Sequence, residues 1–407
     1  MNEERQGTVS GSLWRLGRTQ AILVLGALLN AVAFFAVLPF APLYLADRTS
    51  LSASAIGLVV GGIAFTASVG GVLGGALVDR FGAVRLMTAG LAGYVVVYTS
   101  LTSVRGTFAI VLLLSLGVFR LLLEPGGKKL LSQVDDDGRL FRLRYMAFCM
   151  GGIVGPAVGG VLYTTNVVAF FLVPAAFYAG YLVLLVTCGR ELSALDRDAD
   201  RPSSSYALRD AARDRRLLAA VGAGLTIFFV FSQLESMLPL IVRDKYGDAA
   251  GSYFAALFIA NAVLALALQP LIYRASRKVP RGPFVIAGCA AFALSFACFW
   301  AGQHGLVWYF AGIALWTLGE GVLLPMPDIA VHEIAEGDRK GVYFGIAELR
   351  YLGFFLGPLT GGLLLDSAAP LYFTAMALVI FACVPLLLGR FTAPSGAVPE
   401  RGTTGAD

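Results

Sequence analysis

Long apolar segments separated by short polar loops dominate this sequence. We expect helices at about 19–45, 54–78, 86–104, 107–127, 143–164 and 167–188, and after a polar interval at about 217–242, 251–273, 283–302, 306–330, 341–365 and 370–390. Each segment is close to the roughly 20 residues that a helix needs to cross a bilayer. The pattern predicts an all-α polytopic membrane protein with twelve transmembrane helices.

The polar interval in the middle divides the twelve segments into two sets of six. It mixes Asp with Arg and contains Pro202 followed by three serines, which is too polar to enter a membrane. We expect a first six-helix half at 1–189, a linker with a short surface helix at 190–216, a second half at 217–390 and a disordered tail at 391–407.

One glycine-rich stretch recurs in the second half. GGIVGPAVGG at 151–160 and GFFLGPLTGG at 353–362 match at five positions with an offset of 202, and the segments around Pro125 and Pro327 repeat at the same offset. Rows of small residues let helices approach closely within a bilayer. The repeat predicts two copies of one six-helix unit, with these helices at the centre of each half.

Composition places the chain in a membrane. Hydrophobic residues make up 57% and charged residues 14%, whereas soluble domains have roughly 45 to 50% and 25%. The net charge of +5 therefore does not predict a nucleic-acid partner. The five cysteines lie in apolar spans without CxxC spacing, so we expect neither a disulfide nor a metal site, and no cofactor. We expect a monomer.

The basic residues predict the orientation. Of the 31 Lys and Arg, two lie inside spans and four in one set of loops, which leaves 25 on the side of the N-terminus. Cytoplasmic loops carry such an excess. Both termini and the linker are therefore expected in the cytoplasm of a cell-membrane protein. Because each half has an even number of spans, the repeats would be parallel, with a cleft between them.

Two motifs resemble those of the major facilitator superfamily. Gly75-Ala-Leu77-Val-Asp79-Arg80-Phe-Gly82-Ala-Val-Arg85 is similar to the family's cytoplasmic signature, G-x-L-x-D-R-x-G followed by basic residues. GGIVGPAVGG resembles its helix-five antiporter motif, which is associated with drug:proton exporters. The resemblance covers nearly the whole chain and implies the major facilitator fold.

The same resemblance extends to a charged residue of the fourth expected helix. Arg120 resembles the family's helix-four arginine, although Glu124 stands where a glycine is usual. The likeness implies a role for Arg120 in proton coupling.

The signature loop and the glycine rows supply the candidate gating residues. A carboxylate at Asp79 can accept hydrogen bonds at the start of helix eleven or pair with Arg139, Arg142 or Arg144, and so latch one conformation. An exposed turn with an ordinary surface ion pair is the alternative. The gating candidates are Asp79, Arg80, Gly82, Gly155, Pro156, Gly357 and Pro358.

Few ionisable residues fall within the spans, because a charge near the bilayer centre costs at least about 2.5 to 3.5 kcal/mol. We expect these groups to couple protons or contact substrate, and they are Glu320, Glu235, Arg120, Glu124 and Glu348. Arg120 and Glu124 lie one turn apart and can pair with each other. Ion pairs that only lock helices together are the alternative.

Glu320 ranks first among the acids because it lies near mid-depth without a basic neighbour one turn away. Burial would favour its protonated form, and a cleft open to the other side would rehydrate it. It either carries the coupling proton or meets a cationic substrate. Glu235 lies nearer the external end, and Glu348 is either neutralised by Arg350 or serves the cytoplasmic side.

The remaining polar and aromatic residues predict a mostly apolar cavity. Its lining candidates are Asn30, Phe34, Gln233, Asn261 and Trp316. Core packing is the alternative for the aromatic residues, and an interhelical hydrogen bond for the asparagines. The shortage of polar groups favours a lipophilic or amphipathic substrate.

These observations predict a secondary active transporter that exports a small molecule in exchange for protons. An importer or exchanger of a specific metabolite is the alternative. We do not expect an enzyme, because the sequence has no Ser-His-Asp, metal or phosphate-loop constellation. The expected partners are the small-molecule substrate, protons and the lipid bilayer.

Overall fold

A computed structural model describes residues 16–134, 139–197, 213–334, 343 and 346–389. Within them the chain is helical and has no strand, which confirms the expected all-α fold. The predicted tail and most of the predicted linker lie outside the described residues.

The helices before the linker occupy six successive spans. They are α1 (Arg18–Val37) with η1 (Leu38–Phe40) and α2 (Ala41–Arg48), α3 (Ala53–Phe81), α4 (Ala83–Leu101), α5 (Thr107–Val134), α6 (Arg139–Thr165) and α7 (Val167–Thr187). A short helix, α8 (Gly189–Arg197), follows them.

The helices after the linker occupy the remaining spans. They are α10 (Arg215–Phe231) with α11 (Gln233–Ser236) and α12 (Leu238–Tyr246), η2 (Gly247–Ala249), α13 (Ala250–Ser276), α14 (Arg281–Ala301), η3 (Gly302–His304), α15 (Leu306–Leu323), α16 (Met326–Ile334), η5 (Glu348–Leu352) with α18 (Gly353–Ser367), and α19 (Ala369–Val379) with η6 (Ile380–Ala382) and α20 (Cys383–Leu388). Nine segments of the described chain are long and apolar enough to cross a membrane, and the longest contains both α10 and α13.

The signature loop between α3 and α4 shows why a glycine stands in it. Gly82 ends α3 and precedes α4 with a φ of 88°, a left-handed conformation that other residues adopt at a cost. Its N–H donates to the carbonyl of Val78 at 2.8 Å, which closes the last turn of α3. Two long helices can therefore reverse direction over a single residue.

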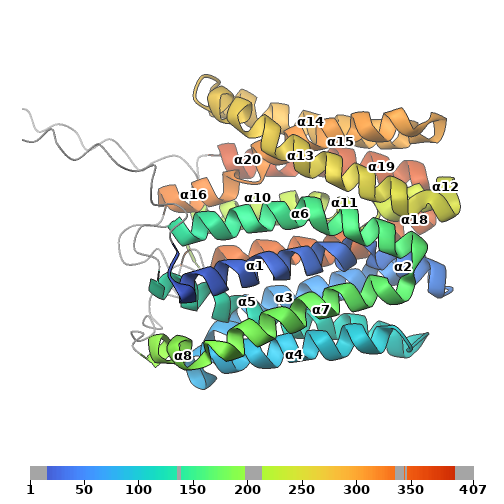
Figure 1. Ribbon diagram of the computed structural model, residues 1–407. Coiled ribbons are helices and arrows are strands. Elements are labelled where there is room, and N and C mark those ends of the chain that lie inside the picture. The colour runs from blue at the N-terminus through green and yellow to red at the C-terminus, as the bar shows by residue number, and fades with distance from the viewer. Residues whose placement is uncertain (1–15, 135–138, 198–212, 335–342, 344–345, 390–407) are drawn as a thin grey trace, which may run out of the picture.

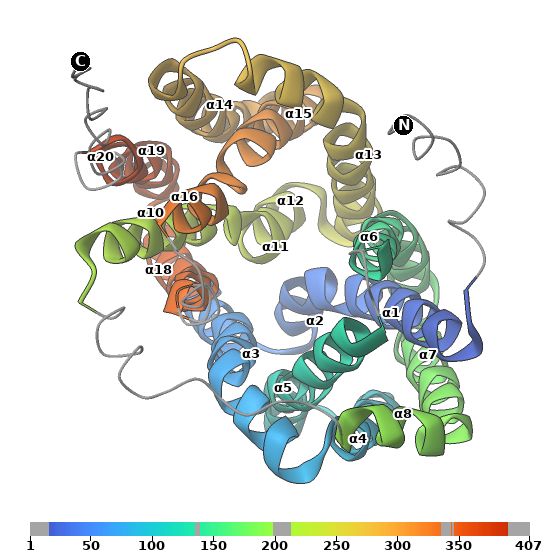
Figure 2. The same ribbon diagram turned by 90° about the vertical axis from the view of Figure 1, so that its left-hand side faces the viewer.

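The helices lie side by side in two groups that meet along two seams (Figure 1). In Figure 2 the first seam joins α3 to α18 and the second joins α6 to α13. The helices that carry the glycine repeat, α6 and α18, therefore lie at the boundary between the groups. The expectation that they occupy the centre of each half is wrong.

The first glycine row packs α6 against two different helices. A Cβ added at four of its five glycines, all but Gly152, would come closer than 3.0 Å to a neighbouring atom, which real Cβ atoms essentially never do. Three of these glycines face α1 and one faces α13 across the seam: Gly151 meets Ala31, Gly155 meets Phe35, Gly159 meets Ala36 and Gly160 meets Ala255. The row therefore permits helix contacts that any larger side chain would prevent.

The second row repeats this arrangement on α18. Three glycines face the first span of their own half, and the fourth faces α3 of the other half: Gly353 meets Leu225, Gly357 meets Ser232, Gly361 meets Gln233 and Gly362 meets Ala53. The two copies of the sequence repeat therefore make equivalent helix contacts in the two halves. In both copies one helix joins its own first span to the opposite group.

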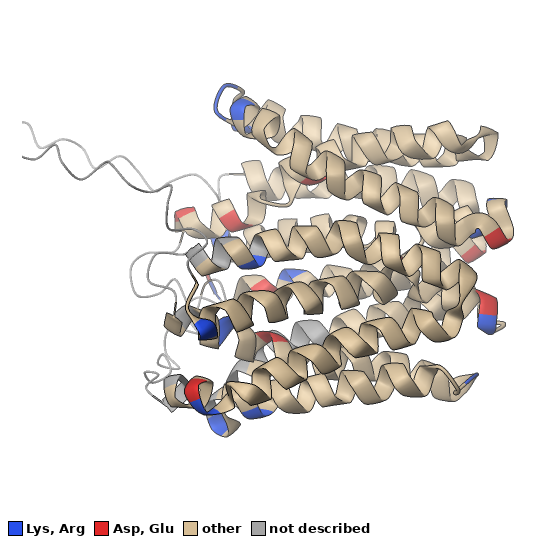
Figure 3. Cartoon of the chain, viewed as in Figure 1, with Lys and Arg blue, Asp and Glu red and all other residues tan. Residues whose placement is uncertain are grey.

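Charged residues mark the two ends of the bundle. We call the end at which α7 passes into α8 the linker side, and the opposite end, which carries α2 and α12, the far side. Most of the described Lys and Arg gather at the linker side (Figure 3). The charge pattern predicts that this side faces the cytoplasm.

We predict that Gly155→Leu and Gly357→Leu each lower the yield of folded protein severalfold. Overpacking a tight contact costs about 1 to 3 kcal/mol, and both positions lack room even for a Cβ. Size-exclusion chromatography and thermal unfolding of the solubilised protein measure the effect. The control is Gly180→Leu, because the nearest atom to a Cβ there is 4.0 Å away. Equal behaviour of all three variants would contradict the packing role.

Candidate functional site

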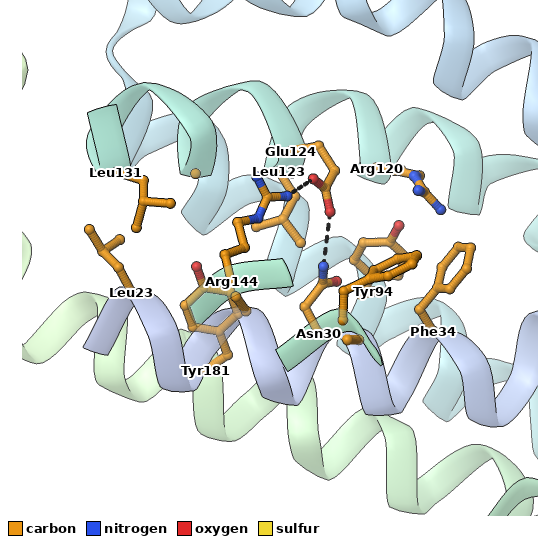
Figure 4. Close-up of a pocket in the computed structure, with 14 residues that line it drawn as sticks. Leu23, Asn30, Phe34, Tyr94, Arg120, Leu123, Glu124, Leu131, Arg144 and Tyr181 are labelled. Carbon is orange, nitrogen blue, oxygen red and sulfur yellow. Dashed lines mark hydrogen bonds and ion pairs between the residues drawn. The ribbon is translucent and has the colours of Figure 1, made fainter. Parts of the chain in front are cut away.

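A cavity opens between the helices of the first group. It holds about 680 Å³ of space not filled by protein, part of it open to solvent. Its lining is apolar and aromatic apart from four polar side chains: Leu23, Ala27, Asn30, Ala31, Phe34, Tyr94, Arg120, Leu123, Glu124, Gly127, Leu131, Arg144, Phe148 and Tyr181. Figure 4 shows α5 and α1 facing each other across it. Two of the predicted lining candidates, Asn30 and Phe34, are among these residues.

Glu124 is held from two other helices. The guanidinium of Arg144 on α6 forms an ion pair with its Oε2, and the Nδ2 of Asn30 on α1 donates to its Oε1 at 3.0 Å. The possible ion pair of Glu124 with Arg120 does not form: Arg144 takes this place, and Arg120 acts on Glu124 only within electrostatic range. Both oxygens of the carboxylate are already bound by partners that approach across the cavity (Figure 4).

Arg120 points instead toward an aromatic ring. Its Cζ lies 4.2 Å from the centroid of the Phe34 ring, a cation–π contact between α5 and α1. Within the part of the chain that the structure describes, its guanidinium makes no hydrogen bond or ion pair. Arg120 therefore presents unused donors to the cavity.

Two acids in the spans of the second group, Glu320 and Glu235, form no ion pair with a basic residue among the described residues. Glu320 on α15 accepts a hydrogen bond from the Nδ2 of Asn261 at 2.8 Å, and the same amide is 3.0 Å from the hydroxyl of Thr317. Glu235 on α11 has no hydrogen-bond partner there and lies within electrostatic range of Arg120 and Glu320. Among the described residues, the second group thus contributes two carboxylates without an ion-pair partner.

Two predicted cavity residues belong to the core instead. Gln233 is 1% exposed, donates to the carbonyl of Phe229 and accepts from the hydroxyl of Tyr372. Trp316 is fully buried, and the Phe292 ring meets it edge to face at 4.7 Å. The sequence could not show which face of each helix they occupy. Asn261 is also buried and acts through its hydrogen bonds.

Glu348 belongs to a structural ion-pair group. The buried guanidinium of Arg350 lies 2.5 Å from a carboxylate oxygen of Asp328 on α16 and 3.7 Å from one of Glu348. This agrees with the reading that Arg350 neutralises Glu348, although Asp328 is the nearer partner. The group joins α16 to η5 and does not line the cavity.

Most residues of the latch predicted at Asp79 are not described by the structure. The side chains of Asp79, Arg139 and Arg142 and the expected start of helix eleven are not among the described parts. Arg144, the third suggested partner, binds Glu124. Arg80 is exposed and lies over the ring of its neighbour Phe81. The latch stays a prediction.

The prolines of the two glycine rows lie inside helices. Pro156 is buried within α6, and Pro358 within α18. The carbonyl of Pro358 abuts Gly57 of α3, where a Cβ could not fit. Pro358 therefore lies directly on the seam between the two groups.

An ion pair joins the two groups at the far side. The Nε of Arg243 on α12 lies 2.5 Å from Oδ1 of Asp47 on α2, and its terminal nitrogen donates to the carbonyl of Ala46 at 3.0 Å. The hydroxyl of Tyr163, at the end of α6, donates to the other oxygen of Asp47. Three spans therefore meet at one carboxylate.

In a second far-side contact the acid comes from the second group and its partners from the first. Asp366, at the end of α18, accepts hydrogen bonds from the N–H groups of Ala53 and Ser54 at 3.0 and 2.8 Å, so it occupies the first turn of α3. Desolvation opposes ionisation, but the bonds from Ser54 and Ala53 hold the pKa of Asp366 below its usual range. The described structure is thus tied together at the far side.

Comparison with known proteins identifies the family. The Major Facilitator Superfamily matches residues 23–348 and again 248–405. The chain belongs to this superfamily. It is therefore a multi-pass membrane protein of a family of transporters, as the motifs predicted.

Individual relatives agree with this assignment. The MFS-type transporter YqjV of Bacillus subtilis is 27% identical over 379 residues, covering 90% of this chain and 92% of that protein. The multidrug resistance protein MdtH of Aeromonas hydrophila is 25% identical over 362 residues, covering 87% and 89%.

Solved structures share the fold at lower identity. A POT family transporter in complex with 5-aminolevulinic acid superposes with a TM-score of 0.75 at 14% identity, covering 91% of this chain and 95% of that one. The nucleoside transporter NupG gives a TM-score of 0.75 at 14% identity, covering 90% and 99%.

We predict that Asp47→Asn combined with Asp366→Asn weakens closure of the far side. Each contact is partly exposed and contributes about 0 to 1 kcal/mol, so the double variant should shift the conformational balance by up to about thirtyfold. Spin labels at Thr165 and Asp248, which are exposed on the far side of opposite groups, should report longer distances.

The control is Arg281→Gln, which removes an ion pair with Glu333 inside the second group. It should leave the far-side distance unchanged. An unchanged distance in the double variant as well would show that these contacts do not hold the far side closed.

Proposed function

We propose that this protein exports a lipophilic or amphipathic small molecule in exchange for protons. The observation that carries the proposal is the contrast between its acids. Glu124 is fully paired, whereas Glu235 and Glu320 have no basic partner in the described part of the chain. Uncompensated acids within a membrane are costly and mark proton or ion pathways.

The substrate class rests on the cavity. Aliphatic and aromatic side chains dominate its lining, and one of its four polar groups, Glu124, is neutralised by another, Arg144. Such a surface suits an apolar body with few polar anchors. The similarity to MdtH, a multidrug resistance protein, supports the same class.

Alternating access supplies the mechanism. The two groups of helices rock against each other along the seams α3/α18 and α6/α13, and the far-side contacts close one entrance. Glu320 takes up a proton when water reaches it from one side and releases it when water reaches it from the other. The protein would work as a monomer in the cell membrane, with both termini in the cytoplasm.

We predict that Glu320→Gln abolishes uphill export, with a loss of at least about tenfold, and retains counterflow. Glutamine keeps the hydrogen bond with Asn261 but cannot release a proton. Everted vesicles with an imposed proton gradient and a panel of lipophilic substrates measure both activities.

The control is Glu333→Gln, the same replacement at a surface ion pair. Export by Glu320→Gln at the wild-type pH dependence would exclude Glu320 as the carrier. Movement of substrate in the same direction as protons in the wild type would replace the proposal with an importer.

A further inference from the structure

We propose that the transported molecule is an amphipathic zwitterion, whose carboxylate binds Arg120 and whose ammonium group binds Glu235. The inference rests on the proposed transport function, because it names the substrate class of that site. It starts from two opposite charges, one in each group of helices, that the described protein leaves unpaired.

The anionic end of the ligand is specified by Arg120. Its guanidinium lines the cavity and makes only a ring contact with Phe34 within the described residues. Nearby, Arg144 forms the ion pair with Glu124, so the guanidinium of Arg120 has no direct ion-pair partner on this wall among the described residues. A planar guanidinium matches a carboxylate with two parallel hydrogen bonds.

The cationic end is specified by Glu235. This side chain lies on α11, which contacts η1 of the first group. In the chain, η1 begins one helical turn after Phe34. The ring of Phe34 is the one that the Arg120 guanidinium lies over. The helix that carries Glu235 therefore lies close to the wall that carries Arg120, and the two charges are within electrostatic range of each other.

Glu320 fits the role of proton carrier beside this pair. It lies within electrostatic range of Glu235 but is hydrogen-bonded to Asn261. An ammonium group held at Glu235 would favour the ionised form of Glu320 and so promote release of its proton. Substrate and proton then exclude each other, as an exchanger requires.

The body of the ligand would rest on the apolar part of the cavity. Phe34, Tyr94 and Phe148 offer aromatic faces, and Leu123 adds an aliphatic surface. A molecule that pairs with both Arg120 and Glu235 would bind more tightly than a purely cationic or purely anionic compound of the same shape.

Four probes with one naphthyl body test the proposal. They are naphthylalanine, its amide, its N-acetyl derivative and its N-acetyl amide, which are zwitterionic, cationic, anionic and neutral. Isothermal titration calorimetry with the purified full chain in detergent measures their affinities. We expect the zwitterion to bind about tenfold to a hundredfold more tightly than either singly charged probe, because each lost contact involves a charged group.

The variants assign each charge. Arg120→Gln should remove the advantage of naphthylalanine over its amide, Arg120→Lys should keep part of it, and Glu235→Gln should remove the advantage over the N-acetyl derivative. Arg105→Gln, at an exposed loop position of the far side, should change nothing. Thermal unfolding of each variant checks that it is folded.

Equal affinities for the four probes, a preference for the amide or the N-acetyl derivative, or no binding of naphthylalanine to the wild type would overturn the proposal. Retained discrimination in Arg120→Gln or Glu235→Gln would do the same. Because binding is measured without a gradient, tight binding of the zwitterion without proton-driven export would refute the proposed function and leave this inference standing.

Discussion

Close helix contact at the two glycine rows is the constraint on which the rest of this structure depends. Lipid is as apolar as leucine, so helices in a bilayer associate through packing and hydrogen bonds and not through hydrophobicity. Gly159 against Ala36 and Gly361 against Gln233 bring each row onto the first span of its own half, while Gly160 and its counterpart in α18 face the other half. Each row therefore fixes a helix within one half and sets the seam along which the halves meet.

The charged residues in the spans fall into two classes: those in ion pairs that hold helices together, and those that have no ion-pair partner in the described structure. Arg144 with Glu124 and Arg350 with Asp328 join neighbouring helices within a half. Each such pair offsets the cost of keeping charge away from water. An acid such as Glu320 has no basic partner in the described structure, and that cost is what makes a proton or a ligand a favourable partner. In the proposed mechanism, the two groups move along the tight seams, and the unpaired charges bind the proton and the ligand.

Much of this architecture was accessible from sequence. The apolar spans and the repeated glycine row followed from spacing, and the signature loop at 75–85 followed from its resemblance to the family motif. The sequence did not show which side chains contact one another. Arg120 and Glu124 are neighbours on one helix, but Arg144 competes from another helix, and nothing in the local sequence reveals that approach. Trp316 was placed in the cavity because its helix face was unknown. The far-side contacts join residues far apart in the chain, so sequence patterns gave no signal for them.

The central claim is that protonation of the second-half acids controls which side of the protein is open. Spin-label distances across the far side, at Thr165 and Asp248, and across the linker side, at Thr187 and Ser276, test it most directly. In the wild type the two distances should change in opposite directions between pH 5.5 and about pH 8.5, over the range in which a carboxyl group in a desolvated site titrates. A variant with Gln at both Glu235 and Glu320 should show no such change. Distances that are independent of pH in the wild type, or equally dependent in the variant, would contradict the account.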